Sequence, residues 1–278
     1  MYCVPWILPQ ISFDFERNDD TDEKTKNKRK TMIEDTLCDQ KLRLDIFEQE
    51  KASLRAALPR NQMNVCKELI NTCALKGKKM MFIGDAPGHY ASILLKNDKT
   101  VKWLAINAKT DPLYFKVLRN NENGMQWCQE DKPGDDLKWF YENTDLVISN
   151  TCYNVSIYND LENEYTLEFL KKEILFALKM QQKNGTFLFG MKKPKHYFEF
   201  QLLYWISCIY EHVSLLTPKT TESTELYVCA HIRKCMTETE LTRLENVLKN
   251  DEYVEIPELW ITETLLALDQ ILFARVES

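Results

Sequence analysis

The stretch MMFIGDAPGHYASILL, residues 80–95, joins an apolar run to a Gly-Asp-Ala-Pro-Gly turn and then to a helical pattern. The run Met80–Ile83 is short, apolar and ended by a glycine, as expected of a buried strand. Gly84 and Gly88 permit unusual dihedrals and a close approach of the backbone to a ligand. A helix that begins at about His89 would present free backbone N–H groups to a carboxylate or phosphate. The stretch therefore predicts a strand, a ligand-binding turn and a helix.

The spacing of the glycines separates this turn from two common nucleotide-binding loops. It has neither the G-x-x-x-x-G-K-[ST] pattern of a P-loop nor the G-x-G-x-x-G pattern of a dinucleotide site. In an open parallel sheet, however, the first strand-to-helix turn lies where ligands bind, outside the carboxyl ends of the strands. Two interpretations remain open for the stretch alone: a ligand-binding turn, or a plain tight turn in another doubly wound protein.

Apolar runs of strand length alternate with helical patterns after Lys79, and the clearest helical pattern covers Leu161–Met180. The runs are Met80–Ile83, Val101–Ile106, Leu146–Ser149 and Thr186–Phe189. This alternation predicts a parallel sheet with helices on both faces. Two further runs, HVSLL (212–216) and ELYVCAHI (225–232), are joined by a loop too short for a crossover helix, so we expect them to pair antiparallel. The predicted fold class is α/β, with a mostly parallel sheet and an antiparallel last strand.

Composition and charge limit the possible functions. The 278 residues, 44% of them hydrophobic, suffice for one large α/β domain with extensions. The formal net charge of -6 gives no general attraction to nucleic acid, so a polyanion would need a local basic patch. Nine cysteines without a Cys-x-x-Cys pair, and only four histidines, favour reduced thiols over a disulfide framework or a zinc site, and we expect no metal.

No segment has the pattern of a signal peptide or of a membrane span. The start MYCVPWILPQ lacks a basic region and a long apolar core, and the best internal apolar run, 202–210, is too short to cross a bilayer. We therefore expect a soluble, cytoplasmic chain. Residues 17–30 form a mixed-charge run without apolar periodicity. We divide the chain into an N-terminal arm with a helical extension (1–60), a central domain (61–235) and a helical C-terminal extension packed on that domain (236–278).

Four motifs together resemble those of FtsJ-like, S-adenosylmethionine-dependent RNA methyltransferases. GDAPG resembles motif I of that family, KWLAINAKTDPL (102–113) the second strand and loop of poxvirus cap 2′-O-methyltransferases, DLVISN (145–150) the fourth-strand motif and STELYVCA (223–230) the final Ser-x-Glu strand. They follow the order of the family between about Asn61 and Arg233. The resemblance implies a Rossmann-like methyltransferase sheet over 61–235 and S-adenosylmethionine as cofactor. Poxvirus and nidovirus cap enzymes share these motifs, which implies a viral protein in the host cytoplasm, with a viral replication complex as a candidate partner.

The resemblance also implies where the cofactor is held. The residues concerned are Gly84, Asp85, Ala86, Pro87, Gly88 and Tyr90 around the turn, Asn107 after the second strand, Cys128, Gln129 and Glu130 after the third, and Asn150 after the fourth. Asn107 stands where the family usually has an acidic residue on the ribose hydroxyls. An amide can still bond a hydroxyl, although Asn107 could equally be a simple strand-end cap. Asp131 could replace any of the three residues after the third strand.

Family members that methylate a ribose 2′-hydroxyl use a Lys-Asp-Lys-Glu tetrad, because a hydroxyl is a poor nucleophile until its proton is removed or shared. Here the first lysine falls near Arg60 or Asn61, the aspartate is Asn150, the central lysine aligns with Gly190, and only the glutamate is kept, as Glu225. Lys192 lies two residues beyond Gly190 on the same strand and could act in its place. The candidate catalytic residues are therefore Glu225, Asn150 and Lys192.

The incomplete tetrad favours another acceptor. Guanine N7 carries a free lone pair at neutral pH, so its methylation needs positioning but no general base. We therefore expect guanine-N7 methylation of a GpppN cap. Ribose 2′-O-methylation with a degenerate tetrad and a catalytically inactive stimulatory subunit remain the alternatives.

Capped RNA, the expected partner, would bind at the loop after the fifth strand, MKKPKHYF (191–198). The substrate contacts that we expect there and nearby are Lys192, Lys193, Lys195 and His196 on phosphates, and Tyr153 stacked on a base. Tyr90 and Tyr197 are further candidates for stacking. A solvated loop is the alternative interpretation. We interpret His89 as a structural cap, His212 and His231 as packing residues, and Trp103 and Trp139 as core residues, and the oligomeric state stays open.

Overall fold

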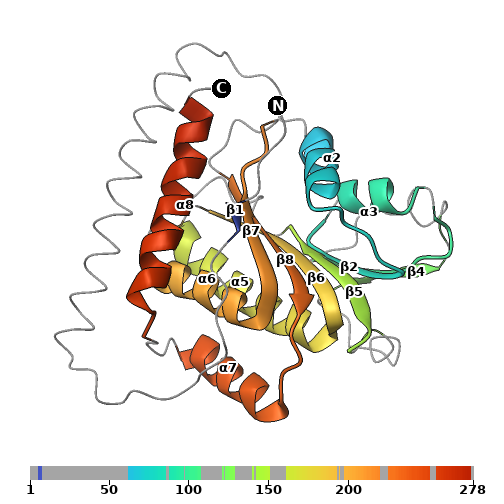
Figure 1. Ribbon diagram of the computed structural model, residues 1–278. Helices are drawn as coiled ribbons and strands as arrows, with labels where there is room; N and C mark the ends of the chain where they lie inside the picture. Colours follow the sequence, from blue (N-terminus) through green and yellow to red (C-terminus); the bar gives the residue numbers. More distant parts are fainter. Residues whose placement is uncertain are drawn as a thin grey trace.

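The computed structural model (Figure 1) describes residues 6–7, 62–85, 88–96, 98–107, 121, 123–128, 140, 142–150, 161–192, 194, 197–219, 225–250 and 255–276. The strands are β1 (Trp6–Ile7), β2 (Lys79–Ile83), β3 (Lys102–Asn107), β4 (Gly124–Cys128), β5 (Thr144–Ser149), β6 (Gln181–Lys192), β7 (Tyr210–Leu216) and β8 (Glu225–Arg233). They form one eight-stranded sheet in the order β1-β7-β8-β6-β5-β2-β3-β4.

Five adjacent strands, from the middle of the sheet to its edge at β4, are parallel. β4, β3, β2, β5 and β6 all run in one direction, with Phe82 of β2 opposite Ala105 of β3 on one side and Ile148 of β5 on the other. The predicted strands after Lys79 are confirmed; β2, β5 and β6 are longer than predicted, whereas β3 is shifted by one residue, from 101–106 to 102–107. The parallel arrangement places the carboxyl ends of these five strands at a single edge of the sheet.

The antiparallel part consists of β8, which lies between β6 and β7 and pairs antiparallel with both. This confirms the antiparallel pairing expected of the last two strands. Beyond β7 the short strand β1 pairs antiparallel, with Trp6 opposite Leu215 and Ile7 opposite Ser214. The sequence gives no sign of β1, because two residues show no alternation, and we had assigned them to the N-terminal arm.

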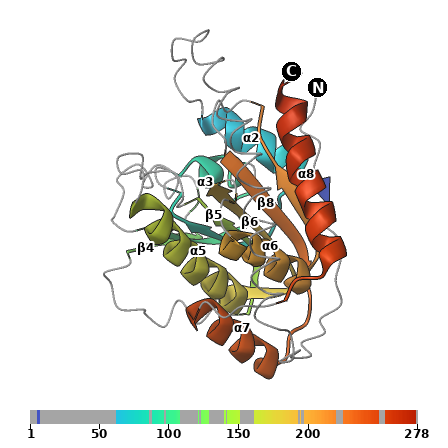
Figure 2. The same ribbon diagram turned by 90° about the vertical axis from the view of Figure 1, so that its left-hand side faces the viewer.

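Helices cover both faces of the sheet (Figures 1 and 2). They are α2 (Gln62–Thr72), α3 (His89–Leu94), α5 (Leu161–Met180), α6 (Tyr197–Ile209), α7 (Glu238–Asn250) and α8 (Glu258–Val276). One buried cluster joins the sheet to α5, α6, α7 and α8, and a second joins its other face to α2 and α3. Among the helices of the described residues, none is both long and apolar enough to cross a membrane.

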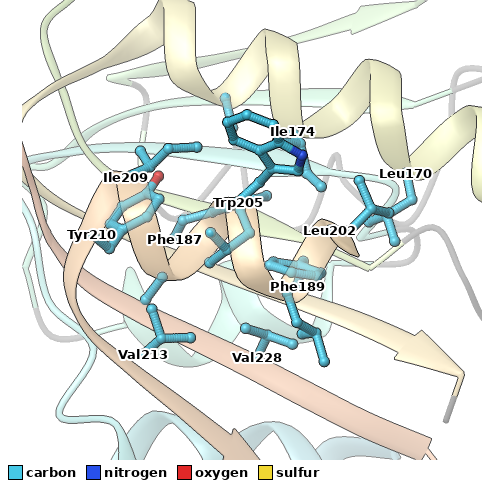
Figure 3. Close-up of a cluster of buried hydrophobic side chains, with 14 of the residues drawn as sticks. Leu170, Ile174, Phe187, Phe189, Leu202, Trp205, Ile209, Tyr210, Val213 and Val228 are labelled. Carbon is cyan, nitrogen blue, oxygen red and sulfur yellow. The ribbon is translucent and has the colours of Figure 1, made fainter. Parts of the chain in front are cut away.

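Strand residues alternate between the two clusters. In β2, Met81 and Ile83 belong to the larger cluster, whereas Met80 and Phe82 belong to the cluster beneath α2 and α3. Both faces are thus apolar, which explains why β2 reads as a continuous apolar run. Figure 3 shows part of the larger cluster, where Trp205 of α6 lies among side chains of α5, β6 and β8.

Candidate functional site

The site lies at the carboxyl edge of the sheet, between β2 and β5. The chain leaves β2 to form β3 on one side and later returns to form β5 on the other, so the strand order reverses at this point. The N–H of Gly84 donates to the carbonyl of Ile106 at 2.8 Å, and the N–H of Asn150 donates to the carbonyl of Ile83 at 2.9 Å. These bonds hold Gly84 and Asn150 side by side at the switch point, where open α/β sheets bind ligands.

The turn after β2 needs its two glycines. Gly84 has φ 63° and Gly88 has φ 95°, and both values lie in the left-handed region that side chains disfavour. Gly88 donates its N–H to the carbonyl of Asp85, which closes the turn immediately before α3. The glycines predicted to shape this turn are therefore required by its backbone conformation.

Asp85 caps α3 from inside the turn. Its carboxylate is fully buried and accepts the backbone N–H groups of Tyr90 at 3.2 Å and Ala91 at 3.0 Å. We had expected the N–H groups at the start of this helix to await a ligand, but two of them bind this carboxylate. An anionic cap at a helix start is stabilising, because the free N–H groups carry partial positive charge there. A contact of Asp85 with the cofactor remains a prediction.

Cys66 of α2 packs behind the same turn. The thiol is buried and hydrogen-bonds the side chain of Tyr90. Burial, with the nearby charge of Asp85, raises the pKa of Cys66 to about 12, so it stays a neutral thiol. Cys66, Asp85 and Tyr90 thus connect α2, the turn and α3. The sequence marks Cys66 only as one apolar position of a helix.

Two of the three aromatic rings that are candidates for stacking on a base, Tyr90 and Tyr197, are 1% and 4% exposed. Each belongs to a core cluster, Tyr90 beneath α2 and α3 and Tyr197 on the opposite face. Neither ring is offered to a base at the surface, so this expectation is corrected for both. Trp103 is fully buried, as predicted.

A buried polar pair fixes the end of β5. The hydroxyl of Ser149 donates to the carboxylate of Glu173 in α5, and both side chains are buried. Ser149 directly precedes Asn150, so α5 helps to position the strand end that forms one wall of the switch point. The sequence does not indicate Glu173, because the contact joins residues far apart in the chain within an otherwise ordinary helical pattern.

The candidate catalytic residues Lys192 and Glu225 lie opposite each other in the β6–β8 ladder. In the same ladder Gly190 lies opposite Tyr227. β8 begins at the edge where β6 ends, so this pair shares the carboxyl edge with Gly84 and Asn150. Residues that face each other in an antiparallel ladder lie on the same face of the sheet.

Two further predicted residues meet at this edge, since Asn107 at the end of β3 pairs with Cys128 at the end of β4. The predicted site residues that the structure describes thus lie at one edge of the sheet. They stand at the ends of β3, β4, β5 and β6, at the start of β8 and in the turn after β2. The other predicted site residues lie outside the described residues: Ala86, Pro87, Gln129, Glu130, Tyr153, Lys193, Lys195 and His196. Arg60, Asn61, Asp131 and Trp139 also lie outside them.

The histidines differ from their predicted roles in part. His89 is the first residue of α3, but Gly88 is the N-cap and the helix has no side-chain cap hydrogen bond from it. Burial lowers the pKa of His89 below its ordinary value. His231 is half-buried in β8, whereas His212, opposite it in β7, is exposed and is no core residue.

The residues at the switch point fit S-adenosylmethionine. This cofactor carries a sulfonium cation and a ribose with free hydroxyls. In the described part of the chain, the ends of β2, β3, β4 and β5 carry no lysine or arginine that would repel the cation, whereas β6, further along the sheet, ends in Lys192. The left-handed Gly84 leaves backbone that carries no side chain at this edge of the sheet, and an amide such as that of an asparagine at position 107 can bond hydroxyls.

Several solved methyltransferases are similar to this chain in structure. A candidate ribosomal RNA methyltransferase from Plasmodium falciparum has a TM-score of 0.47 and 19% identity over 63% of this chain and 98% of its own. The methyltransferase domain of METTL16 has a TM-score of 0.41 and 15% identity over 62% and 80%. Human methyltransferase-like protein 13, solved with SAH, has a TM-score of 0.38 and 8% identity over 73% and 96%.

No curated protein sequence matches the chain. The sequence model of the FtsJ-like methyltransferases, in contrast, matches residues 63–233, which run from α2 through the last strand, β8. This match covers more than half of the chain and every strand of the candidate site. The chain therefore belongs to the FtsJ-like methyltransferase family.

Proposed function

We propose that this S-adenosylmethionine-dependent RNA methyltransferase methylates guanine N7 in a GpppN cap at the 5′ end of RNA. Membership of the FtsJ-like family carries the general activity and the cofactor. The acceptor atom is the new part of the proposal. A single observation supports it: Gly190 of β6 stands where the family pattern places its central lysine, and glycine has no side chain to share a proton.

The acceptor follows from the chemistry that the chain can offer. When bound, S-adenosylmethionine supplies an electrophilic methyl group. A ribose hydroxyl would have to lose its proton to attack it, and neither Gly190 nor Asn150 can accept or share that proton. Guanine N7 is already a nucleophile, so the site has only to hold the base in line with the methyl group.

Glu225 and Lys192 then have binding roles. N7 methylation leaves the guanine positively charged, and a carboxylate such as that of Glu225 near the base would favour this product. A cap also carries a triphosphate, and Lys192 at the same edge provides positive charge for it in an acidic protein. In this proposal Glu225 therefore contacts the guanine base, and Lys192 contacts the phosphates of the cap.

The acceptor is tested with two RNAs that differ only in the cap. RNA that begins GpppA should accept a methyl group, whereas the same RNA with m7GpppA should not, because its N7 is already methylated. Equal methylation of both RNAs would contradict the proposal. If neither RNA is methylated although the protein binds S-adenosylmethionine, the inactive stimulatory subunit becomes the better description.

Ribose 2′-O-methylation is the second candidate, and one observation favours it. The register places Lys192 opposite the retained Glu225, so a lysine and a glutamate of the tetrad type are neighbours after all. If Lys192 acts on a hydroxyl proton, Lys192→Ala should lower kcat by about 100-fold or more. If it only contacts phosphate, the KM for RNA should rise by about tenfold with little change in kcat.

Lys183 offers a matched control for this comparison. It is an exposed lysine on the same strand, β6, but at the opposite edge of the sheet. Lys183→Ala removes the same charge from the same element and should leave both kcat and KM unchanged. A fall in activity equal to that of Lys192→Ala would point to general charge or stability rather than to the site.

A further inference from the structure

A buried arginine lies at the amino edge of the sheet, opposite the edge that carries the candidate site. Arg233 ends β8 and is 7% exposed, and its Nη1 donates to the backbone carbonyl of Gln181, the first residue of β6. An arginine keeps its positive charge in a folded protein, so a full charge is buried here. Within the part of the chain that the structure describes, no carboxylate pairs with this guanidinium.

Gln181 supplies a second buried donor beside the arginine. Its side chain is fully buried, and its Oε1 accepts the hydroxyl of Tyr210 at 2.5 Å. Burial raises the pKa of Tyr210, so the phenol keeps its proton and donates it to the amide oxygen. This bond fixes the amide with its oxygen toward Tyr210, and the N–H groups of Nε2 face elsewhere.

The two contacting residues each have a buried donor that lacks an acceptor. Nε of Arg233 and Nε2 of Gln181 are shielded from water, and neither donates a hydrogen bond to any of the described residues. Buried N–H groups almost always have a partner, so this pair points to an acceptor from outside the chain. A buried charge also requires an opposite charge, which a neutral acceptor would not supply.

The backbone around the pair is adapted to these two side chains. A Cβ at Gly185 would lie 2.4 Å from Cγ of Gln181 and 2.8 Å from its Nε2, so only glycine leaves room for the amide. Ile232, directly before Arg233, has φ 60°, a left-handed conformation that is costly for a β-branched residue. Such strain persists only where the surrounding structure enforces it, and it is common at ligand sites.

The left-handed Ile232 determines which face of the sheet receives the arginine. Cys229 belongs to the cluster beneath α2 and α3, and uninterrupted alternation along β8 would place Arg233 on that same face. Instead Arg233 lies opposite Tyr210, which belongs to the larger cluster on the other face. The interruption at Ile232 thus brings the guanidinium to the side where the hydroxyl of Tyr210 bonds Gln181.

We propose that Arg233 and Gln181 form a binding site for a small monovalent anion of the halide class, with chloride as the ligand. Nε of Arg233 and Nε2 of Gln181 donate to the anion. One negative charge balances the guanidinium, whereas sulfate or phosphate would leave a second buried charge without compensation. The low exposure of both side chains excludes a bulky ligand. The site lies at the opposite edge from the cofactor turn and does not depend on methyl transfer.

The melting temperature of the full chain tests the site in solution. A ligand that binds only the folded state stabilises it. At about 0.15 M of each sodium salt, so that the ionic strength is equal, we expect the chain to melt about 2–4 °C higher in chloride than in gluconate, whose anion is too large for the site. Equal melting temperatures in the two salts would overturn the proposal.

Two variants separate this site from general salt effects. Arg233→Met removes the buried charge and should abolish the difference between chloride and gluconate. Lys183→Met is the matched control, because it removes an exposed cation from β6, the strand of Gln181, and should retain the full difference. A difference that persists in Arg233→Met, or disappears in Lys183→Met, would contradict binding at Arg233.

A crystal of the unaltered full chain grown in sodium bromide locates the anion directly, even if Arg233→Met fails to fold. We expect an anomalous peak in contact with Nε of Arg233 and Nε2 of Gln181. A crystal without bromide there, in which a water or the amide oxygen of Gln181 contacts Nε, would overturn the proposal. A bromide peak without the chloride effect on melting would show binding at crystal concentration only and would also overturn it.

Discussion

Individual side chains at the switch point mainly shape the backbone. Asp85 binds the first N–H groups of α3, Cys66 and Tyr90 pack behind it, and Gly84 and Gly88 take left-handed dihedrals. A cofactor that approaches the turn would meet backbone whose position depends on these buried groups. Their substitution should therefore weaken cofactor binding even where the side chain never touches the cofactor.

Asp85→Asn tests this dependence. The amide retains one oxygen acceptor but loses the negative charge that faces the start of α3, so the turn should lose about 1–2 kcal/mol of stability. We expect the Kd for S-adenosylmethionine, measured by calorimetry, to rise by about tenfold. Asp98→Asn is the control variant. Asp98 also accepts a backbone N–H, from Thr100, but at an exposed position away from the site. Equal affinities of Asp85→Asn and the unaltered chain would contradict the capping role.

His231 should make stability depend on pH. Its pKa is lowered in the folded state, so the unfolded chain takes up the proton first as the pH falls. Its contribution is therefore fully present above the ordinary value of 6.5 and is lost as the pH falls below it. The melting temperature of the unaltered chain should fall more between about pH 7 and about pH 5 than that of His231→Gln. An equal fall of the melting temperature in the two proteins would contradict this role of His231.

Helices and strands position the site through contacts between buried polar groups. The hydroxyl of Ser149 at the end of β5 and the carboxylate of Glu173 in α5 bond where both are shielded from water. On the same helix, Lys179 pairs with Glu245 of α7 at 2.5 Å, but both side chains are partly exposed. The two pairs allow a buried and a surface interaction of one helix to be compared.

A double-mutant cycle on each pair should separate them. We expect a coupling free energy of about 2 kcal/mol between Ser149→Ala and Glu173→Leu, because either single change removes a buried hydrogen bond. For Lys179→Ala and Glu245→Ala we expect about 0–1 kcal/mol, as is usual for surface ion pairs. Urea unfolding of all variants provides the measurement. If the surface pair had the larger coupling free energy, the Ser149–Glu173 hydrogen bond would not be the contact that fixes the end of β5.

At the scale of the whole molecule, the features that depend on local sequence patterns could be predicted. Strand and helix order followed from apolar runs such as Met80–Ile83, and the turn from its glycines, because these patterns are local. The N-terminal strand β1 could not be found, since a two-residue strand such as Trp6–Ile7 has no period and exists only through its pairing with β7. The cap by Asp85 was also missed, because an acidic residue in a ligand-binding motif suggests a ligand contact.

Long-range contacts account for most of what the sequence left open in the site. Glu173 meets Ser149 only because α5 returns over the sheet. The register of Lys192 against Glu225 likewise depends on how β8 is placed between β6 and β7. Each of these pairs is visible only in the tertiary structure, because its two residues lie far apart in the sequence.

The location of the transferred methyl group tests the central claim most directly. RNA that begins GpppA is incubated with the protein and S-adenosylmethionine labelled in the methyl group, and then digested with a nuclease that leaves the cap intact. The label should be recovered in m7GpppA, which chromatography separates from GpppAm. Label found in GpppAm would contradict methylation at guanine N7 and would return the lysine and glutamate of the β6–β8 ladder to a role in ribose chemistry.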